Sequence, residues 1–96
     1  MNRTEIVSAL DALKAELDAF NVASLRLFGS YARETAGEHS DIDLIVAFGG
    51  PATFDNYMGL KLFLEDRLGR KIDLVTESAI RPELRQTIER DAIRVA

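Results

Sequence analysis

The segment at residues 41–48 constrains the fold of this chain most strongly. It reads D-I-D-L-I-V-A-F, and its continuously apolar second half is typical of a strand that is covered on both faces. A helix is predicted over residues 53–68, with Gly69 as its stop, and a further strand over residues 71–75. Because the connection between these strands contains a whole helix, it favours a parallel pair. We therefore expect a sheet with helices packed against it.

A long amphipathic helix is predicted near the start of the chain. Asn2 or Thr4 could cap it, and Asn21 could end it. The apolar residues of this segment recur at spacings of three and four, which places them on one stripe of a 3.6-residue repeat: Ile6, Leu10, Leu13, Leu17 and Phe20. The pattern indicates one continuous helix.

Shorter elements are predicted elsewhere. Residues 24–28 alternate apolar and polar side chains, which indicates a short strand, and a brief helix is expected over residues 31–34. Pro82 is placed in the first turn of a last helix that runs to about Arg90, and residues 93–95 are expected to add an edge strand. The fold class is therefore α/β (α+β), with a small mixed sheet of three to four strands flanked by helices.

Size and composition exclude several classes of protein. Because 96 residues support one core, residues 1–96 are expected to form a single domain. The chain has no cysteine, which excludes disulfides and thiolate zinc sites, and His39 alone cannot build a histidine metal cage. The longest fully apolar run, residues 44–48, is far too short to span a membrane. No apolar signal core is present at the N-terminus, so a cytoplasmic location is expected.

Three aspartates are the candidate metal ligands. Asp41 and Asp43 lie two apart on a strand, so both point to one face, and Asp73 has the same position between apolar neighbours in the next strand. If the two strands are adjacent, the three carboxylates surround one or two positions for Mg²⁺, and a pair of ions is the arrangement used in phosphoryl and nucleotidyl transfer. The alternative is that Asp41 caps the strand and that Asp43 and Asp73 are ordinary solvated residues.

Gly29 and Ser30 form a candidate phosphate cradle directly after an apolar strand. Glycine lets the backbone approach a ligand closely, and exposed N–H groups with a serine hydroxyl can bind phosphate oxygens. Arg33, one helical turn beyond Ser30, could add positive charge to the same phosphates. The alternative is an ordinary strand-to-helix turn with Ser30 near the N-cap.

The spacing of these two motifs resembles a known family. Gly29-Ser30, ten residues and then Asp41-x-Asp43 is similar to the G-S-x(10)-D-x-D signature of the nucleotidyltransferase superfamily that resembles DNA polymerase β. The segments L-F-G-S-Y-A-R, S-D-I-D-L-I-V and R-K-I-D-L-V resemble its minimal nucleotidyltransferase (MNT) group, and the likeness spans about residues 25–77. Glu34 departs from the pattern, because many members have glycine there.

The resemblance implies a nucleotidyltransferase fold and a role for each motif residue. Gly29 and Ser30 would hold the triphosphate of a nucleotide, and Asp41 and Asp43 would ligate Mg²⁺. Asp73 would complete the metal site and help to deprotonate the incoming hydroxyl. The catalytic set implied is therefore the same as the metal-binding set.

A chain of this size leaves no room for a lobe that holds the acceptor, so the acceptor is expected on another polypeptide. The resemblance extends to the antitoxins of HEPN/MNT toxin–antitoxin pairs, which implies transfer of AMP from ATP to a tyrosine of a HEPN partner with release of pyrophosphate. The alternative is a non-catalytic antitoxin that masks its partner, which the apolar girth of residues 54–68 favours. A homo-oligomer is left open.

A DNA-binding role is disfavoured. The formal net charge of −4 opposes binding to nucleic acid phosphates, and no helix-turn-helix pattern is recognisable in the sequence.

Overall fold

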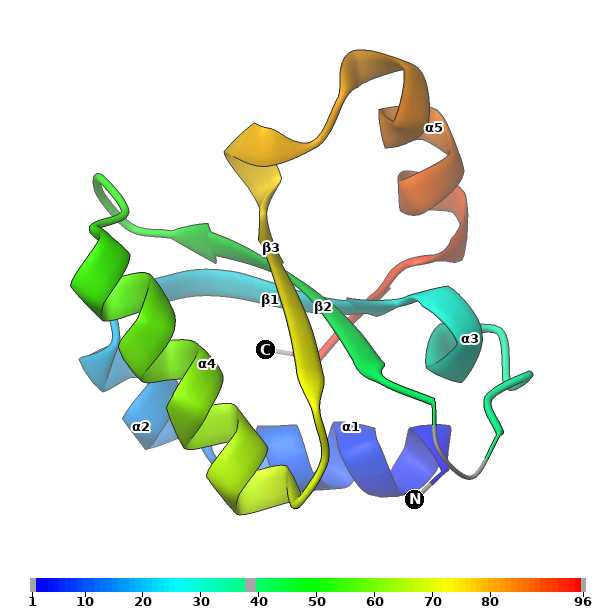
Figure 1. Cartoon of the computed structure of the whole chain (residues 1–96), viewed down its shortest axis with the longest axis horizontal. Coiled ribbons are helices and arrows are strands. Elements are labelled where there is room, and N and C mark those ends of the chain that lie inside the picture. The colour runs from blue at the N-terminus through cyan, green and yellow to red at the C-terminus, as the bar shows by residue number, and fades with distance from the viewer. Residues whose placement is uncertain (1, 38–39, 96) are drawn as a thin grey trace.

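Four strands form one mixed sheet in the order β3-β2-β1-β4 (Figure 1). The computed structural model describes residues 2–37 and 40–95, so His39 lies outside the described part. Strand β2 runs parallel to β3, whereas β1 runs antiparallel to both β2 and β4. The strands are β1 (Val22–Phe28), β2 (Ile42–Phe48), β3 (Ile72–Thr76) and β4 (Ile93–Arg94). The predicted mixed sheet, its parallel pair and its short edge strand are confirmed.

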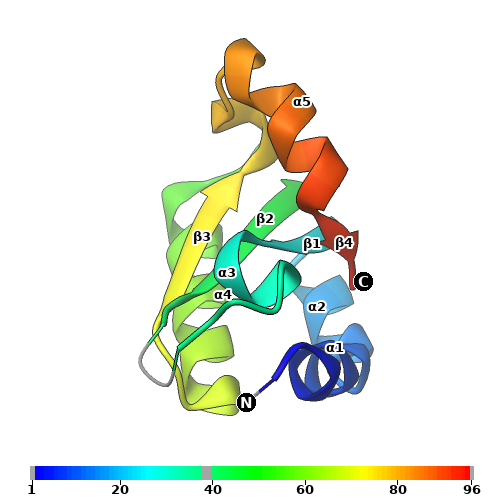
Figure 2. The ribbon, with the colours of Figure 1, turned by 90° about the vertical axis from the view of Figure 1, so that its right-hand side faces the viewer.

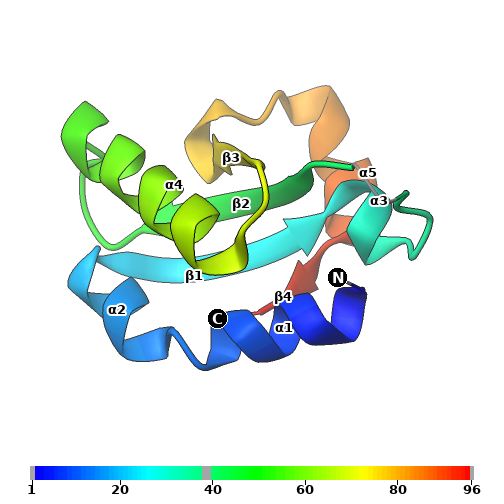
Figure 3. The same ribbon diagram turned by 60° about the horizontal axis from the view of Figure 1, so that its bottom comes forward.

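The helices lie on both sides of this sheet. Figure 3 shows α1, α2 and α4 in front of the strands and α5 behind them, and Figure 2 shows α3 at the end of β1. The helices are α1 (Arg3–Asp11), α2 (Lys14–Ala19), α3 (Gly29–Ala32), α4 (Phe54–Leu68) and α5 (Pro82–Asp91), and a 3₁₀ turn, η1 (Glu77–Ala79), follows β3. None of the helices in the described residues is long and apolar enough to cross a membrane.

The main core lies between the sheet and the helices α1, α2 and α4. Alternation along the strands sends every second side chain to this side. The fully buried members include Leu25 and Leu27 from β1, Leu44 from β2, Ile72 from β3, Ile6 and Leu10 from α1, and Leu60 and Leu64 from α4. Ile45 and Ile80 are also buried but belong to the opposite side of the sheet, beneath α5. The sheet therefore has a core face and a second face that is free to carry a site.

The predicted single N-terminal helix is wrong, because the chain forms two helices there. Asn2 is the cap of α1, with its side chain accepting from the Glu5 amide at 2.8 Å and the Glu5 carboxylate accepting in return. At the junction, the Leu13 amide donates to the Leu10 carbonyl at 3.0 Å, a tighter i to i−3 turn that interrupts the α-helix. Leu10 and Leu13 both stay buried across this break, so the apolar stripe survives while the helix does not.

Helix α4 agrees with the sequence prediction at both ends. The Thr53 hydroxyl accepts from the Asn56 amide at 3.1 Å, and Gly69 ends the helix in the left-handed conformation with φ 63°. Pro82 is likewise the first residue of α5, as predicted. Helix α5 differs from α4 in that none of its residues is buried.

Candidate active site

Asp43 and Asp73 are direct neighbours across the parallel strands β2 and β3. Their flanking residues Ile42, Leu44 and Ile72 are buried in the main core, so the two carboxylates point to the opposite face of the sheet. Asp43 is half-buried and Asp73 is exposed. The predicted convergence of these two aspartates on one face is confirmed by this register.

Asp41 lies just outside β2 and is exposed. Its negative charge still acts on Asp43, so the three acids share one electrostatic environment. Within the described residues, however, no three metal-ligating side chains are arranged so that they could hold an ion by themselves. The arrangement of all three aspartates around Mg²⁺ therefore stays a prediction.

The environment of Asp43 disfavours its charged form. Burial raises the pKa of Asp43 to about 6 from 3.8, and the charge and side-chain hydrogen bond of Asp73 and the charge of Asp41 act in the same direction. The positive charge of Arg33 acts on Asp43 in the opposite direction and lowers its pKa. A carboxylate pair short of positive charge is an environment that a cation would stabilise.

Gly29 is required at the end of β1 for two reasons. Its φ of +73° lies in the left-handed region, which side chains disfavour. A Cβ at this position would overlap Asp43 Oδ2 and lie 3.0 Å from Asp43 Cγ. The backbone of the turn therefore runs directly alongside the carboxylate, as close approach to a shared ligand requires.

Ser30 is not the N-cap that the alternative prediction made it. Helix α3 begins at Gly29, its N-cap position is Phe28, and no side chain caps it. The Thr35 amide donates a hydrogen bond to the Ser30 carbonyl at 2.8 Å, which connects the residues after α3 to its start. Ser30 is thus the second residue of a short helix, half-buried beside Gly29.

Contacts from α1 hold this turn in place. Arg3 donates through Nη1 to the Ala32 carbonyl at 3.0 Å and forms an ion pair with Glu34 at 3.4 Å. Glu34 has a φ of 60°, a left-handed conformation that glycine adopts without cost, which explains why glycine suits this position in the resembling family. Tyr31 is buried, so it packs beneath the turn and does not present its ring for stacking.

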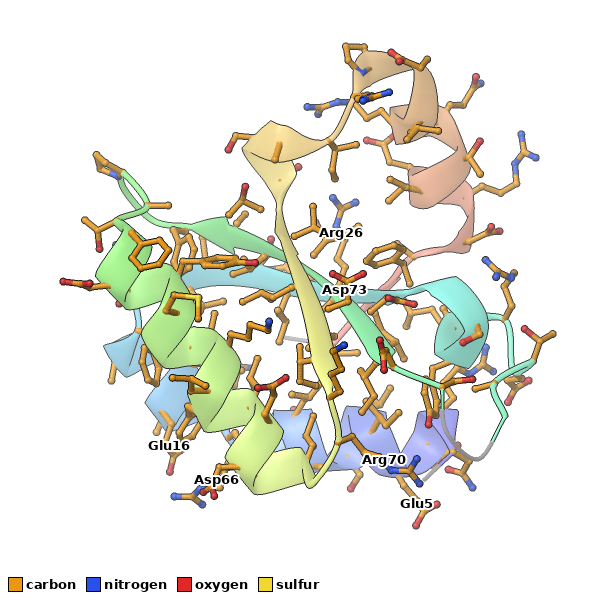
Figure 4. The ribbon with its side chains drawn as sticks, in the orientation of Figure 1. Glu5, Glu16, Arg26, Asp66, Arg70 and Asp73 are labelled. Atoms are coloured by element: carbon orange, nitrogen blue, oxygen red, sulfur yellow. The ribbon has the colours of Figure 1, made fainter. Side chains whose placement is uncertain are left out.

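Arg26 is a charged residue of the same face that sequence reasoning missed. It lies on β1 opposite Ile45, and its side chain forms an ion pair with Glu77 of η1 at 3.5 Å. Figure 4 labels Arg26 and Asp73 on the part of the sheet below α5. The alternation of S-L-R-L-F could have indicated this, because it places Arg26 on the face of the strand opposite to the buried Leu25 and Leu27.

The donor set at this face fits Mg²⁺ chemically. Mg²⁺ prefers oxygen ligands and is usually held by one or two carboxylates that are completed by substrate phosphates and water. Asp43 and Asp73 supply such a pair, and burial, together with the negative charges of Asp73 and Asp41, raises the pKa of Asp43. The Gly29–Ser30 turn lies next to this pair, where phosphates that share the ion would be bound.

Comparison with protein families identifies residues 8–95 as a match to the model of the nucleotidyltransferase domain. A relative from Thermococcus cleftensis, named protein adenylyltransferase MntA, is 37% identical over 92 residues, which cover 95% of this chain and 93% of the relative.

Solved structures share the fold. A structure described as a candidate minimal nucleotidyltransferase has a TM-score of 0.85 at 36% identity and covers 97% of this chain and 95% of its own. Two toxin–antitoxin structures share the fold at lower identity. One, with AMP-PNP, has a TM-score of 0.73 at 22% identity and covers 100% of this chain and 73% of that one. The other, a tri-AMPylated Shewanella oneidensis HEPN toxin with its MNT antitoxin, has a TM-score of 0.67 at 19% identity and covers 94% and 71%.

Proposed function

The chain belongs to the nucleotidyltransferase domain family, and we propose that it transfers AMP from ATP to a tyrosine of a HEPN-type partner protein with release of pyrophosphate. The observation that carries this proposal is the pairing of Asp43 with Asp73 directly beside the Gly29 turn. The name of the T. cleftensis relative supports protein as the acceptor, and the AMP-PNP and AMPylated toxin complexes support ATP and a HEPN partner. We also propose that residues 1–96 act as one domain, in the cytoplasm.

In this proposal the turn after β1 binds the triphosphate. Gly29 admits phosphate oxygens close to the backbone, Ser30 contributes its hydroxyl, and Arg33 adds a positive charge. Because Arg33 already acts on Asp43, it lies near enough to serve phosphates bound beside that carboxylate. The hydrogen bond from Arg3 to the Ala32 carbonyl ties the end of α3 to α1 and so limits movement of the turn.

The aspartates hold the metal and position the reacting groups. Asp41, Asp43 and Asp73 provide the carboxylates, and bound Mg²⁺, as two ions, would neutralise the phosphates and polarise the α-phosphoryl group. Asp73 is exposed and therefore accessible to an incoming hydroxyl, whose proton it accepts. Asp43 is half-buried and held against Asp73, so it fixes the orientation of the pair.

A transfer assay tests this function. The chain is incubated with Mg²⁺, its HEPN-type neighbour and ATP labelled at either the α- or the γ-phosphate. Label from the α-phosphate alone should enter the partner, and Asp43→Asn should reduce the rate at least 100-fold because it removes a carboxylate of the central pair. Asp66→Asn, an exposed acid on α4, is the matched control and should retain full activity. Transfer of γ-label, or full transfer by the Asp43 variant, contradicts the proposal.

A second candidate function is masking of the partner without transfer. Phe54 and Leu62 on α4 are 75% and 58% exposed, and large apolar side chains left in water favour a protein contact. The test is growth protection in cells that express the toxin. Protection by Asp43→Asn together with its loss in Phe54→Ser/Leu62→Ser supports masking, whereas loss of protection in Asp43→Asn shows that masking is insufficient.

A further inference from the structure

An apolar hollow lies beside the carboxylate pair on the same face of the sheet. Its volume is about 270 Å³, and residues of helix α5 and the turn η1 line it on the side opposite the strands. Apolar side chains dominate its lining: Phe28, Ile45, Val75, Ile80, Leu84 and Ile88. The hollow is separate from the main core, because Ile45 and Ile80 are buried without joining the core cluster.

The strands place this hollow at a fixed offset from the reacting groups. Ile45 follows Asp43 by two residues on β2, and Val75 follows Asp73 by two on β3, so all four side chains share one face. Two residues along a strand advance about 6.6 Å. The hydroxyl of a tyrosine lies on the long axis of its ring, so a ring over Ile45 and Val75 can point its hydroxyl along the strands toward the carboxylates.

We propose that the hollow beneath α5 binds the aromatic ring of the acceptor tyrosine and makes the site selective for phenolic acceptors over serine and threonine. The inference rests on the proposed function and names the part of the molecule that chooses the acceptor. A ring seated on Ile45 and Val75 directs its hydroxyl toward Asp43 and Asp73. A serine side chain has no ring to occupy the hollow, so it gains no binding free energy from the apolar lining.

The chemistry of the lining favours a phenol over the adenine of the nucleotide. Adenine carries polar atoms around its whole edge, and burying them without partners is costly. Arg81 is the charged member of a lining whose other side chains are apolar, and its guanidinium offers only donors, so no side chain of the lining accepts from the adenine amino group. A phenol buries an apolar ring and keeps a single hydroxyl at one end. The volume is ample, since a cavity of about 150 Å³ is enough to bind benzene.

The transfer step balances with ATP as the co-reactant. The phenolic oxygen forms a bond to the α-phosphorus of ATP while the bond between that phosphorus and the bridging α–β oxygen breaks. Pyrophosphate leaves with the electron pair, and the phenolic proton passes to the Asp73 carboxylate. The hollow contributes orientation, because it holds the phenolic oxygen next to the carboxylates.

Helix α5 is suited to be the adjustable wall of this subsite. None of its residues is buried, and Leu84 remains 51% exposed even though it lines the hollow. A ring that enters would contact Leu84 and remove apolar surface of both partners from water. Leu84 can therefore be shortened with little damage to the main core.

Ring binding is measured first, without ATP or a partner. The probe is p-cresol, which carries the tyrosine ring and hydroxyl, titrated into protein with isotope-labelled isoleucine, leucine and valine methyl groups. We expect NMR shift changes at Ile45, Val75 and Leu84. Leu84→Ala should weaken p-cresol binding about fivefold, as expected for the loss of roughly 40 Å² of apolar contact. Gln86→Ala, at an exposed position of α5 that does not line the hollow, is the control and should leave binding unchanged.

The outcomes separate this inference from the proposed function. Shifts at these methyl groups with adenosine instead of p-cresol, or no shifts with either probe, overturn the inference even if AMP transfer occurs. When the partner is labelled, Leu84→Ala should raise the KM for the partner about fivefold with little change in kcat, and a lower kcat at unchanged KM contradicts the role. Ring binding without any transfer would instead refute the proposed function and leave the ring site standing.

Discussion

At the scale of single residues, Asp43 lowers the stability of the fold and is also a central residue of the candidate site. Its carboxylate is half-buried next to Asp73, and the pKa of Asp43 is raised to about 6 mainly by burial. The folded chain therefore holds a proton at this position that the unfolded chain releases at lower pH. Placing the acid here lowers the stability of the metal-free protein at neutral pH.

Asp43→Asn should therefore stabilise the metal-free protein. Below pH 3.8 the wild-type carboxyl is protonated in both states, and its destabilising effect develops as the pH rises toward about 6. Because solvent screens a partly exposed group, we expect a gain of about 1 kcal/mol at pH 7.5. Urea unfolding in EDTA between pH 4 and 8 measures it, with Asp66→Asn as the control. A gain that is largest at acid pH would contradict the account.

Substitution of the two tyrosines by phenylalanine should change the free energy of unfolding in opposite directions. The Tyr31 hydroxyl is buried without a partner in the described residues, whereas the Tyr57 hydroxyl donates to the Leu74 carbonyl. Tyr31→Phe should raise the free energy of unfolding by about 1 kcal/mol, and Tyr57→Phe should lower it by about 1 kcal/mol. Thermal or urea unfolding of the two variants checks this. Equal effects of the two substitutions would show that the hydroxyl environments do not differ as described.

At the scale of elements, those with local signals could be predicted from the sequence. Helix α4 has a threonine cap and a glycine stop, and α5 starts at its proline. The break between α1 and α2 has no such signal, since Leu10 and Leu13 keep a helical spacing and neither glycine nor proline marks the junction. The break is therefore visible only in the folded structure, where both helices pack against the sheet.

In the candidate site, too, some features could be predicted from local sequence patterns and others could not. The face shared by Asp43 and Asp73 followed from strand alternation and from the helical crossover that made the strands parallel. The start of α3 one residue before Ser30 did not follow, because it depends on the left-handed Gly29. The ion pair of Arg26 with Glu77 joins residues 51 positions apart, a contact that local patterns do not contain.

The free edge of β3 is covered by side chains of α4. The Ile72 amide donates to Glu65 Oε2 at 3.0 Å, and the Leu74 carbonyl accepts from Tyr57. Glu65→Ala should expose the Ile72 amide, lower the free energy of unfolding by about 1–2 kcal/mol and promote self-association through the open edge. Glu65→Gln keeps an acceptor oxygen and should stay close to wild type. Sedimentation velocity and urea unfolding distinguish these outcomes, and an unchanged Glu65→Ala protein would contradict the role of this contact.

At the scale of the whole molecule, the main core and the candidate site lie on opposite faces of one sheet. The main core fills the side covered by α1, α2 and α4, while the carboxylates and the hollow lie on the side of α5. Figure 3 shows the helices on the two sides of the sheet. The second side has few buried residues, so it can open locally without unfolding the core.

Helix α5 should accordingly exchange its amide hydrogens faster than α4. None of the α5 residues is buried, whereas Leu60, Leu64 and Leu68 anchor α4. We expect protection of α4 to approach the global free energy of unfolding and protection of α5 to fall at least 2 kcal/mol below it. Native-state hydrogen exchange measures both helices in one sample. Equal protection would show that α5 belongs to the same cooperative unit as the core.

The central claim is that the Asp43–Asp73 pair catalyses transfer of AMP to a partner tyrosine, and intact-mass spectrometry of the partner tests it most directly. After incubation with Mg²⁺, ATP and this chain, the partner should gain the mass of one or more AMP groups on tyrosine. The Asp66→Asn control should act as wild type, and Asp43→Asn should leave the partner unmodified. A partner that stays unmodified with the wild-type chain, or that is modified equally by Asp43→Asn, would contradict the account.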